Sequence, residues 1–593
     1  MMPANTYQQR IAAFQTAIAK EKKFTSTLSW ARLFSFIVAL YAAVEYFRHE
    51  RNPLWLPLVA IGLVAFGWLL KKYTRAQRQL ELLKTLLELN EKELKLVTAN
   101  IADFDDGNIY VDDRHDFTGD LDVFGSSSLY QYINRTGTLS GSKLLAERFR
   151  NPLQDVAAIE DTQAALQVLT PELDFRQYLS ANALLAKEDG QDRREIGLWL
   201  QMPQHFFGKR SWEIARWLCP ALAVAMIFVY AFTGAYYPLV LVLLVNWCIL
   251  LSCQKKVLEQ HSLMARKESI LDKLDVLLQS IIQMNVGESK LLKEQQAIAA
   301  GADTALRQLA RISGALDQRL NLLVGFVLNS ILLYDVHCMV NLERWKSRHR
   351  DQMNSWFEVI AIMEVWNSFA TFAFNHPGYN YPKPVGGKLL LEATVLGHPL
   401  IPEAECIRNN GAVGANASFL IITGSNMSGK STFLRSVGAN LLLAMCGAPV
   451  CAASFTFSPM RIMTSMRIKD SIASHTSYFQ AELLRLQHII QQLKAGVPIF
   501  ILLDEILKGT NSEDKLSGSR SLIEHFLAYQ CLGMIATHDL ELGQLETAYP
   551  ARVRNYCFES TIRDNHLFFD YRIREGIARN KNATFLMKQM EII

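Results

Sequence analysis

The stretch IITGSNMSGKSTFLRS (421–436) has the residue spacing of a loop that binds phosphate groups. Three apolar residues, 420–422, lead into Gly424-x-x-x-x-Gly429-Lys430-Ser431, and apolar residues at helical spacing follow at once. The pattern predicts a buried strand, a glycine-rich loop and a helix, in that order.

Such a loop supplies chemistry that suits ATP and Mg²⁺. Its backbone N–H groups surround the phosphates, and the N-terminus of the following helix favours negative charge. Lys430 is placed to reach the outer phosphates, and the Ser431 hydroxyl to bind Mg²⁺. The residues expected to contact ATP are Gly424, Ser425, Asn426, Met427, Ser428, Gly429, Lys430, Ser431 and Thr432. A chance turn before a core helix is the alternative, which the strand–loop–helix context disfavours.

A pair of acidic residues follows the loop further along the chain. The apolar run from Val497 ends in Asp504 and Glu505, as expected for a strand whose tip faces the phosphates. Asp504 would hold Mg²⁺, while Glu505 would polarise the attacking water. His538 ends a further strand pattern, GMIATHDLEL (533–542), where it could sense the terminal phosphate. A capping or core histidine is the alternative for His538. The predicted catalytic residues are therefore Lys430, Glu505 and His538.

Length and composition indicate several domains with membrane parts. The chain has 593 residues, enough for about four domains of roughly 150 residues. Its 61 basic and 57 acidic residues nearly balance, so composition alone argues for neither a nucleic-acid-coating protein nor an acidic tail. The nine cysteines form no C-x-x-C pair and no zinc-type cluster, so we read them as buried thiols in a reducing compartment.

Two regions break the pattern of a soluble protein. Residues 217–254 carry no charge and are interrupted only by the turn-like GAYYP at 234–238. Each arm has about 16 to 19 residues, near the lower limit for crossing a bilayer. A second apolar pair, 33–44 and 53–70, is flanked by aromatic residues. Both regions predict helical hairpins that span the membrane; re-entrant hairpins, or buried core helices of a soluble protein, are the alternatives.

The cations near these hairpins predict their orientation. Lysines at 20, 22 and 23 precede the first hairpin, and Lys71, Lys72 and Arg75 follow it; Arg216, Lys255 and Lys256 flank the other. Positive residues mark the cytoplasmic side. We therefore expect a multi-pass protein of the inner, or cytoplasmic, membrane with its ATPase domain in the cytoplasm.

Long helical patterns lie beside the hairpins. Residues 76–97 and 259–316 carry leucine and isoleucine at three- and four-residue spacing, with charges between them. They predict long amphipathic helices, and no cofactor is implied there. The uncharged run 320–334 is interpreted as a core helix.

The C-terminal third resembles the MutS family of DNA mismatch repair ATPases. The segments that carry the resemblance are TGSNMSGKST (423–432), DSIASHTSYFQAELLRL (470–486), DEILKGTNSEDKLS (504–517), ATHDLEL (536–542) and YRIREGIARNKNATFLMKQM (571–590). Weaker similarity covers 120–153 and 356–374. The resemblance implies a homodimer with composite ATP sites, in which Ser477 reaches the partner's nucleotide in trans. It also implies that Tyr571 stacks on adenine, with Cys406 in place of a second aromatic residue.

The resemblance implies a multidomain fold: an α/β P-loop ATPase domain of ABC-like type, plus an all-α core and lever domain. The transmembrane hairpins predicted from the apolar runs are inserted into this fold. The expected boundaries are 1–75 for the N-terminal region with a hairpin, 76–119 for a connecting helix and linker, 120–385 for the core and lever region with a hairpin at about 213–255, and 386–593 for the ATPase domain.

Two functions are consistent with this organisation. One is a DNA-binding ATPase related to mismatch repair; the other is a membrane-tethered mechanical ATPase with a protein or lipid partner and no DNA role. We find no mismatch-reading domain, and 255–350 is short for a DNA clamp. A transporter is disfavoured because Asn246 is the main polar residue within the apolar spans.

Overall fold

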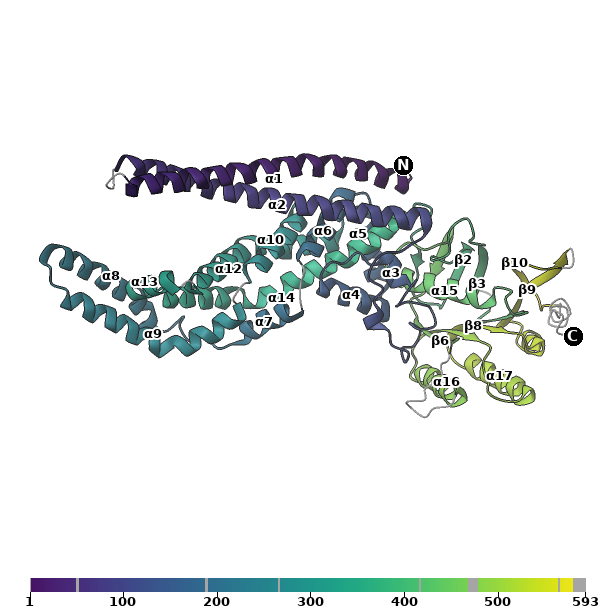
Figure 1. Ribbon diagram of the computed structural model, residues 1–593. Coiled ribbons are helices and arrows are strands. Elements are labelled where there is room, and N and C mark those ends of the chain that lie inside the picture. The colour runs from purple at the N-terminus through teal and green to yellow at the C-terminus, as the bar shows by residue number, and fades with distance from the viewer. Residues whose placement is uncertain are drawn as a thin grey trace.

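The protein is elongated, with two β-sheets at one end and helical hairpins that reach the other (Figure 1). The computed structural model describes residues 2–48, 53–186, 190–264, 267–320, 322–414, 417–467, 478–563 and 566–579. A helical body joins the two ends. The fold is therefore mixed α/β, mostly helical, with its sheets confined to the C-terminal part.

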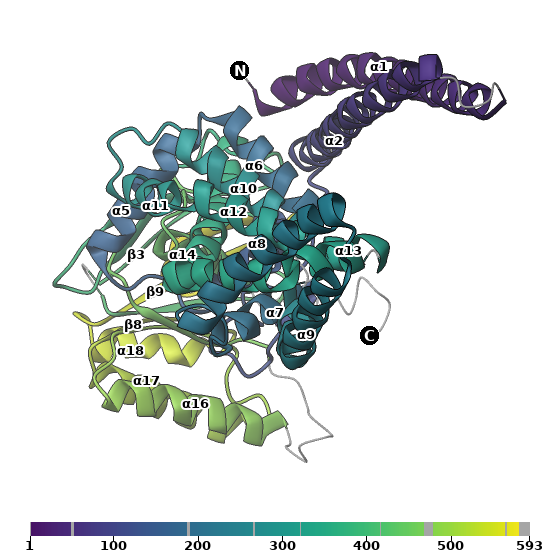
Figure 2. The same cartoon turned by 90° about the vertical axis from the view of Figure 1, so that its left-hand side faces the viewer.

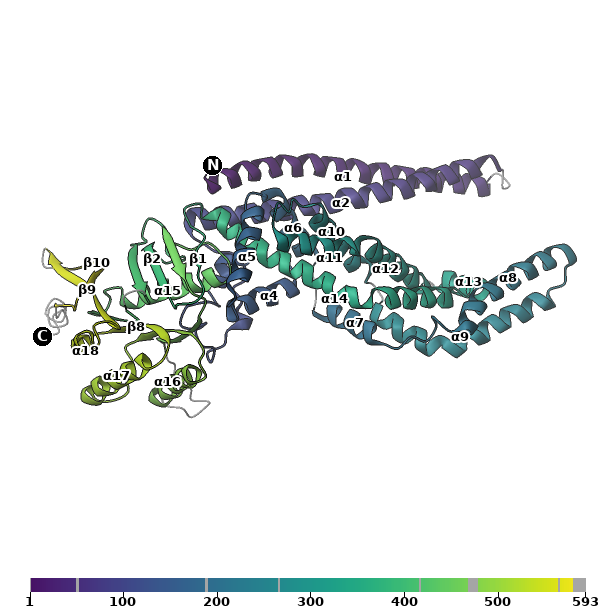
Figure 3. The ribbon, with the colours of Figure 1, turned by 180° about the vertical axis from the view of Figure 1, so that it is seen from behind.

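Both apolar regions form antiparallel helical hairpins. The first consists of α1 (Pro3–Arg48) and α2 (Leu56–Ala99), and the second of α8 (Arg210–Thr233) and α9 (Tyr237–Met264). Their tips point to the same end of the molecule, away from the sheets (Figures 1 and 3), and α1 and α2 lie to one side of the second hairpin (Figure 2). In the most apolar 18-residue stretch of each of these four helices, only 6–17% of the residues are buried, so the apolar side chains face outward.

The helices between the hairpins and the sheets differ in part from the sequence expectation. The predicted helix 76–97 is the second half of α2, which runs unbroken out of the apolar segment. The pattern over 259–316 is divided among the end of α9 and three shorter helices, so it is not one long lever. These and the other helices of the body are α3 (Leu129–Ile133), α4 (Leu139–Arg150), α5 (Val156–Leu169), α6 (Leu173–Ala186), α7 (Gly190–Gln201), α10 (Glu268–Gln283), α11 (Lys290–Ala300) and α12 (Ala302–Asp317).

The run interpreted as a core helix is α13 (Leu322–Leu332), and it is only partly buried. It packs on α8 and α9, while Phe326 and Val327 are 59% and 52% exposed. Its outward face thus continues the apolar surface of the second hairpin.

Helix α14 (Tyr334–Asn375) is the central rod of the body, and it runs from the second hairpin to the sheets (Figure 1). Although it is apolar enough to cross a membrane, its most apolar window is 83% buried among the other helices. Its buried Glu343 accepts hydrogen bonds from the backbone N–H groups of His205, Phe206 and Phe207 at 2.7–2.8 Å, and from the Gln260 amide of α9 at 2.7 Å. A buried carboxylate with four donors is well compensated, so Glu343 fixes the second hairpin to α14.

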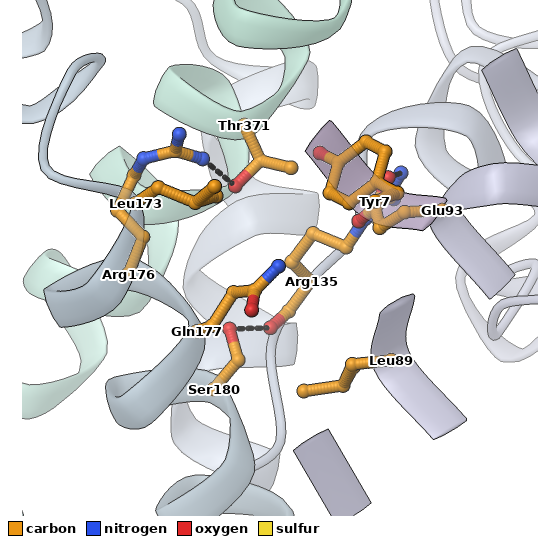
Figure 4. A pocket seen from close by; sticks show the side chains of 9 residues that line it. All are labelled: Tyr7, Leu89, Glu93, Arg135, Leu173, Arg176, Gln177, Ser180 and Thr371. Atoms are coloured by element: carbon orange, nitrogen blue, oxygen red, sulfur yellow. Dashed lines mark hydrogen bonds and ion pairs between the residues drawn. The ribbon is translucent and has the colours of Figure 1, made fainter. Parts of the chain in front are cut away.

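The first hairpin is tied to the other end of α14 by a buried polar network. Three of its residues, Tyr7, Glu93 and Arg135, line a small cavity (Figure 4). Glu93 of α2 forms a two-point ion pair with Arg135 and accepts from Asn375 of α14 at 2.8 Å. Tyr7 of α1 donates to the same Asn375 at 2.7 Å. Both hairpins therefore connect to one continuous helix through buried hydrogen bonds.

The C-terminal part holds two sheets. The larger has the order β10-β9-β4-β8-β7-β6, parallel except for β10, and the smaller has the order β1-β5-β2-β3. The strands are β1 (Lys383–Pro384), β2 (Leu391–Leu396), β3 (Asn409–Val413), β4 (Phe419–Gly424), β5 (Ser454–Phe457), β6 (Arg461–Ser465), β7 (Ile499–Asp504), β8 (Cys531–Thr537), β9 (Val553–Arg563) and β10 (His566–Glu575).

Helices cover both faces of the larger sheet because its central strands are apolar on both sides. Helix α15 (Lys430–Met445) fills the space between the two sheets, and α16 (Tyr478–Lys494) and α17 (Ser512–Leu527) cover the opposite face. A short helix, α18 (Gln544–Ala548), precedes β9. This order places the carboxyl ends of β4, β7 and β8 side by side, where ligands bind in open α/β sheets.

Candidate active site

The loop between β4 and α15 has a backbone that requires glycine at two positions. Gly424 has a φ of 156°, and a Cβ there would lie 2.7 Å from the Phe558 carbonyl oxygen. Gly429 has a φ of 104°, in the left-handed region that favours glycine. The predicted strand, loop and helix are all present.

Lys430 begins α15 and points back into the loop. Its ammonium group donates to the carbonyl oxygens of Gly424 and Ser425 at 2.9 and 2.8 Å. Burial lowers the pKa of Lys430, and the nearby carboxylates of Glu505 and Asp504 oppose this shift. Gly429 caps α15 without a side-chain hydrogen bond, so the first amides of the helix can donate to an anion.

Asp504 ends β7 and forms a side-chain hydrogen bond with Ser431. Burial raises the pKa of the Asp504 carboxyl, whereas this bond lowers it. A hydroxyl and a carboxylate are hard oxygen donors, the type that Mg²⁺ prefers, and Mg²⁺ usually takes only one or two protein ligands beside phosphate and water. These two side chains therefore fit a magnesium ion held next to a phosphate.

Glu505 is held by two cationic or hydrogen-bonding neighbours. Its carboxylate lies 3.2 Å from the Lys508 ammonium group and 3.4 Å from His538 Nδ1. Burial raises the pKa of Glu505, but Lys508 and His538 outweigh burial and leave the pKa below its usual value. The carboxylate is thus ionised at neutral pH, as a general base must be.

His538 belongs to a chain of polar contacts behind Glu505. Its Nε2 lies 3.3 Å from the Lys515 ammonium group, which in turn pairs with Asp539 at 3.0 Å. Since an ammonium group only donates, Nε2 accepts and Nδ1 carries the proton that faces Glu505. Sequence reasoning did not single out Lys508 or Lys515, although both lie within the quoted segment 504–517.

A cavity of about 660 Å³ opens beside the loop, between the larger and the smaller sheet. It brings together many of the predicted residues: Asn426, Met427, Ser428, Gly429, Lys430, Ser431, Thr432, Glu505, Tyr571 and Cys406. It also contains residues that the sequence did not indicate, among them His398, Ile407, Asn409 and Phe558. These come from the smaller sheet, its loops and β9, and no local pattern marks them.

Tyr571 is positioned by its backbone. Its φ is 53°, and its carbonyl oxygen accepts from the Asn409 amide at 3.0 Å, while Asn409 Oδ1 accepts from Ile573 N–H at 2.9 Å. The ring lies over the loop, since a Cβ on Gly429 would approach it to 3.1 Å. Ser477 lies outside the described residues, as does most of the segment around it.

The linker before the body contacts the same domain. Asp120 accepts from the backbone N–H groups of Met466 and Arg467 at 3.1 and 2.8 Å, and from the Thr464 hydroxyl at 2.6 Å. Asp116 pairs with Arg461 at 2.7 Å. The helical body is therefore bonded to the edge strand β6 of the larger sheet.

Residues 420–589 match the family model of MutS domain V. This C-terminal part of the chain is similar to the MutS family. Over 234 residues it is 31% identical to the DNA mismatch repair protein MutS of Thermotoga neapolitana, a match that covers 39% of this chain and 28% of that protein. It is 32% identical over 195 residues to MutS protein homolog 4 of Homo sapiens, covering 31% and 20%, and 31% identical over 232 residues to the DNA mismatch repair protein MutS 2 of Halobacterium salinarum, covering 38% and 26%.

The matches span less than a third of the length of these MutS relatives. They cover between 31% and 39% of this chain. MutS domain V is an ATPase-type domain, and the matched range contains the loop, Asp504, Glu505, His538 and Tyr571.

Proposed function

We propose that this chain is a membrane-attached MutS-type ATPase. The observation that carries the proposal is the cavity at the carboxyl ends of the parallel strands, where the glycine loop, Lys430, the Ser431–Asp504 pair and Glu505 meet. That set supplies a phosphate cradle, a cation, a magnesium site and a base, which are the parts that hydrolysis of a nucleoside triphosphate needs.

Each residue has a role that follows from its contacts. The loop amides and Lys430 bind the phosphates, and Lys430 leaves the Gly424 and Ser425 carbonyl oxygens to do so. Ser431 and Asp504 would hold Mg²⁺, which would supply positive charge beside the phosphate oxygens. Glu505 accepts a proton from the attacking water, and His538 orients Glu505 through the 3.4 Å contact.

The adenine base would lie in the outer part of the cavity. Tyr571 offers a ring there and is 45% exposed, and Ile407 offers an aliphatic side chain that is also 45% exposed. Both surfaces suit a flat, apolar base. Cys406 lies next to Ile407 on the same wall.

The active form is proposed to be a homodimer in which Ser477 completes the partner's site. Mixing Lys430→Ala subunits with Ser477→Arg subunits should then restore one intact composite site and part of the activity. Each variant alone should be inactive. Full activity of a strictly monomeric preparation would contradict this arrangement.

The two hairpins are proposed to span the inner, or cytoplasmic, membrane. Their outward apolar surface, their shared direction and the cations at their bases support this placement. Lys72 lies 4.2 Å over the Trp68 ring and Arg32 lies 4.6 Å over the Tyr73 ring, which places cations and aromatic rings together, as at a membrane interface. The ATPase domain would remain in the cytoplasm.

We propose two alternative roles for the ATPase: it acts on DNA, or it does mechanical work at the membrane. DNA is supported by the names of the relatives, which are DNA mismatch repair proteins. A purely mechanical role at the membrane is supported by α14, because this single helix runs to the sheets and is bonded to the two hairpin regions through Glu343 and Asn375 (Figure 1). We place DNA binding first and the mechanical role second.

A titration with duplex DNA at low salt separates them. If DNA is the substrate, lysines and arginines should bind phosphates without reading mispairs. Affinity should then fall steeply with salt, with a log–log slope of about −0.9 per phosphate contacted, and matched and mismatched duplexes should bind alike. Absence of binding, together with an unchanged ATPase rate, would discard DNA and leave the mechanical role.

A further inference from the structure

Two cysteines meet in the wall of the nucleotide cavity. Cys406 belongs to the loop between β2 and β3 and lines the cavity, while Cys451 is buried behind it, between α15 and β5. A Cβ on Gly397 would lie 2.6 Å from Cys406 Sγ and 2.9 Å from Cys451 Sγ. The two sulfur atoms therefore occupy the space that the missing side chain of Gly397 leaves.

The two thiols share a hydrogen bond. Cys406 Sγ also accepts a hydrogen bond from the His398 backbone N–H. The Tyr379 hydroxyl group donates to Cys451 in turn. The bond with Cys451 lowers the pKa of Cys406 well below its usual value and, with burial, raises that of Cys451.

One partner of the pair is fixed and the other lies on a loop. The Cys451 N–H donates to Asn440 Oδ1 at 2.7 Å, and the Cys451 carbonyl oxygen accepts from Gly397 N–H at 2.8 Å. Cys406 follows a turn in which its N–H donates to the Pro402 carbonyl oxygen at 3.0 Å. Bringing the two sulfur atoms from hydrogen-bonding distance to a bond of about 2.05 Å would thus displace the loop rather than Cys451.

We propose that Cys406 and Cys451 are a redox modification site that closes to a disulfide and weakens nucleotide binding. The oxidant is a small-molecule disulfide such as glutathione disulfide. Cys406 thiolate attacks one of its sulfur atoms, forms a mixed disulfide and releases one glutathione thiolate. Cys451 loses its proton, attacks Cys406 Sγ and releases the second glutathione thiolate, so two electrons pass from the protein to the oxidant.

The consequence for the nucleotide follows from the position of the loop. Ile407 and Cys406 form adjacent parts of the cavity wall, and the disulfide draws both toward Cys451. Loss of the packing of one aliphatic side chain on the base corresponds to about 1.5 kcal/mol, or an affinity about tenfold weaker. This effect rests on the proposed nucleotide binding, whereas disulfide formation itself does not.

The test uses the full-length protein in detergent, with glutathione disulfide as oxidant. Peptide mass spectrometry should find a 406–451 linkage with two hydrogen atoms lost, and a fluorescent ATP analogue should bind about tenfold more weakly until dithiothreitol restores its affinity. Cys451→Ser should block the linkage and the change in affinity. Cys248→Ser, in the second hairpin, should leave the response to oxidation as in the parent.

The outcomes separate the two levels of the proposal. If the reduced protein binds no nucleotide, the proposed function fails, while the mass spectrum still decides on the disulfide. Absence of a 406–451 linkage under oxidation would overturn the inference. A linkage that leaves nucleotide affinity unchanged, or an equal loss of affinity in Cys451→Ser, would overturn its regulatory effect.

Discussion

Replacement of Glu93 by alanine should loosen the attachment of the first hairpin to the body. Glu93 is 4% exposed and accepts hydrogen bonds from Arg135 and Asn375. Its loss leaves the guanidinium group of Arg135, which is 5% exposed, without its carboxylate. Breaking a buried ion pair in this way costs about 3–5 kcal/mol.

The remaining contacts of Arg135 place the expected loss of stability at the lower end of that range. Its guanidinium group still donates to the carbonyl oxygens of Tyr132 and Asn134 at 3.1 and 2.8 Å, and it lies 3.6 Å from the centre of the Phe104 ring. We therefore expect a loss of about 3 kcal/mol, which corresponds to local opening that is about a hundredfold more frequent.

Hydrogen exchange of the protein in detergent measures this opening directly. Amides of residues 89–96 in α2 should exchange about a hundredfold faster in Glu93→Ala than in the parent. The matched control is Glu88→Ala on the same helix, because Glu88 is 64% exposed and pairs with Lys92 at 3.0 Å. An exposed pair contributes about 1 kcal/mol or less, so exchange should change by about fivefold at most. Equal exchange in the two variants would refute the reasoning.

Three further predictions concern membrane attachment, the wall of the cavity and the pKa of the proposed general base, Glu505. The protein should sediment with membranes and resist carbonate extraction; recovery in the soluble fraction without detergent would mean that the apolar hairpins are not embedded in a bilayer. Asn100→Gly should keep the left-handed backbone that ends α2 but remove the 3.1 Å hydrogen bond from the Asn100 amide to the Leu400 carbonyl oxygen in the cavity wall. ATP should then bind about fivefold more weakly in a fluorescence titration, with Thr98→Ala as the control. Unchanged affinity would show that this hydrogen bond does not support the nucleotide site. Lys508→Met should raise the pKa of Glu505, because burial then acts with less opposition, and the acid limb of the pH–rate profile should move to higher pH; an unmoved limb would show that Lys508 does not tune Glu505.

The local parts of the site could be predicted from the sequence. The loop 424–431 needs positive φ angles at Gly424 and Gly429, and the spacing of these two glycines is visible in the sequence. Asp504 and Glu505 stand at the end of a strand that is otherwise made of apolar residues. The residues that the sequence missed, such as Phe558 and Asn409, reach the cavity because the sheets bring distant strands together. Pairing across a sheet leaves no local pattern in the chain.

The helical part shows the same limit. The sequence indicated both hairpins, but α2 continues into the body because Lys71, Lys72 and Arg75 interrupt its apolar face without introducing a helix-breaking residue. The pattern over 259–316 suggested a longer helix than exists, since periodicity does not reveal where helices end; a turn containing Gly287, with a φ of 48°, separates α10 from α11. The Glu93–Arg135 pair joins residues far apart in sequence, so no local rule could have found it.

ATP hydrolysis by Glu505→Gln tests the central claim most directly. The purified variant should bind ATP as the parent does, because its loop, Lys430 and the Ser431–Asp504 pair are unchanged, yet it should hydrolyse ATP on the order of a hundredfold more slowly for want of a base. Glu513→Gln, at the exposed start of α17, should hydrolyse ATP at the parental rate. Hydrolysis by Glu505→Gln at the rate of the parent would contradict the assignment of this cavity as the site of ATP hydrolysis.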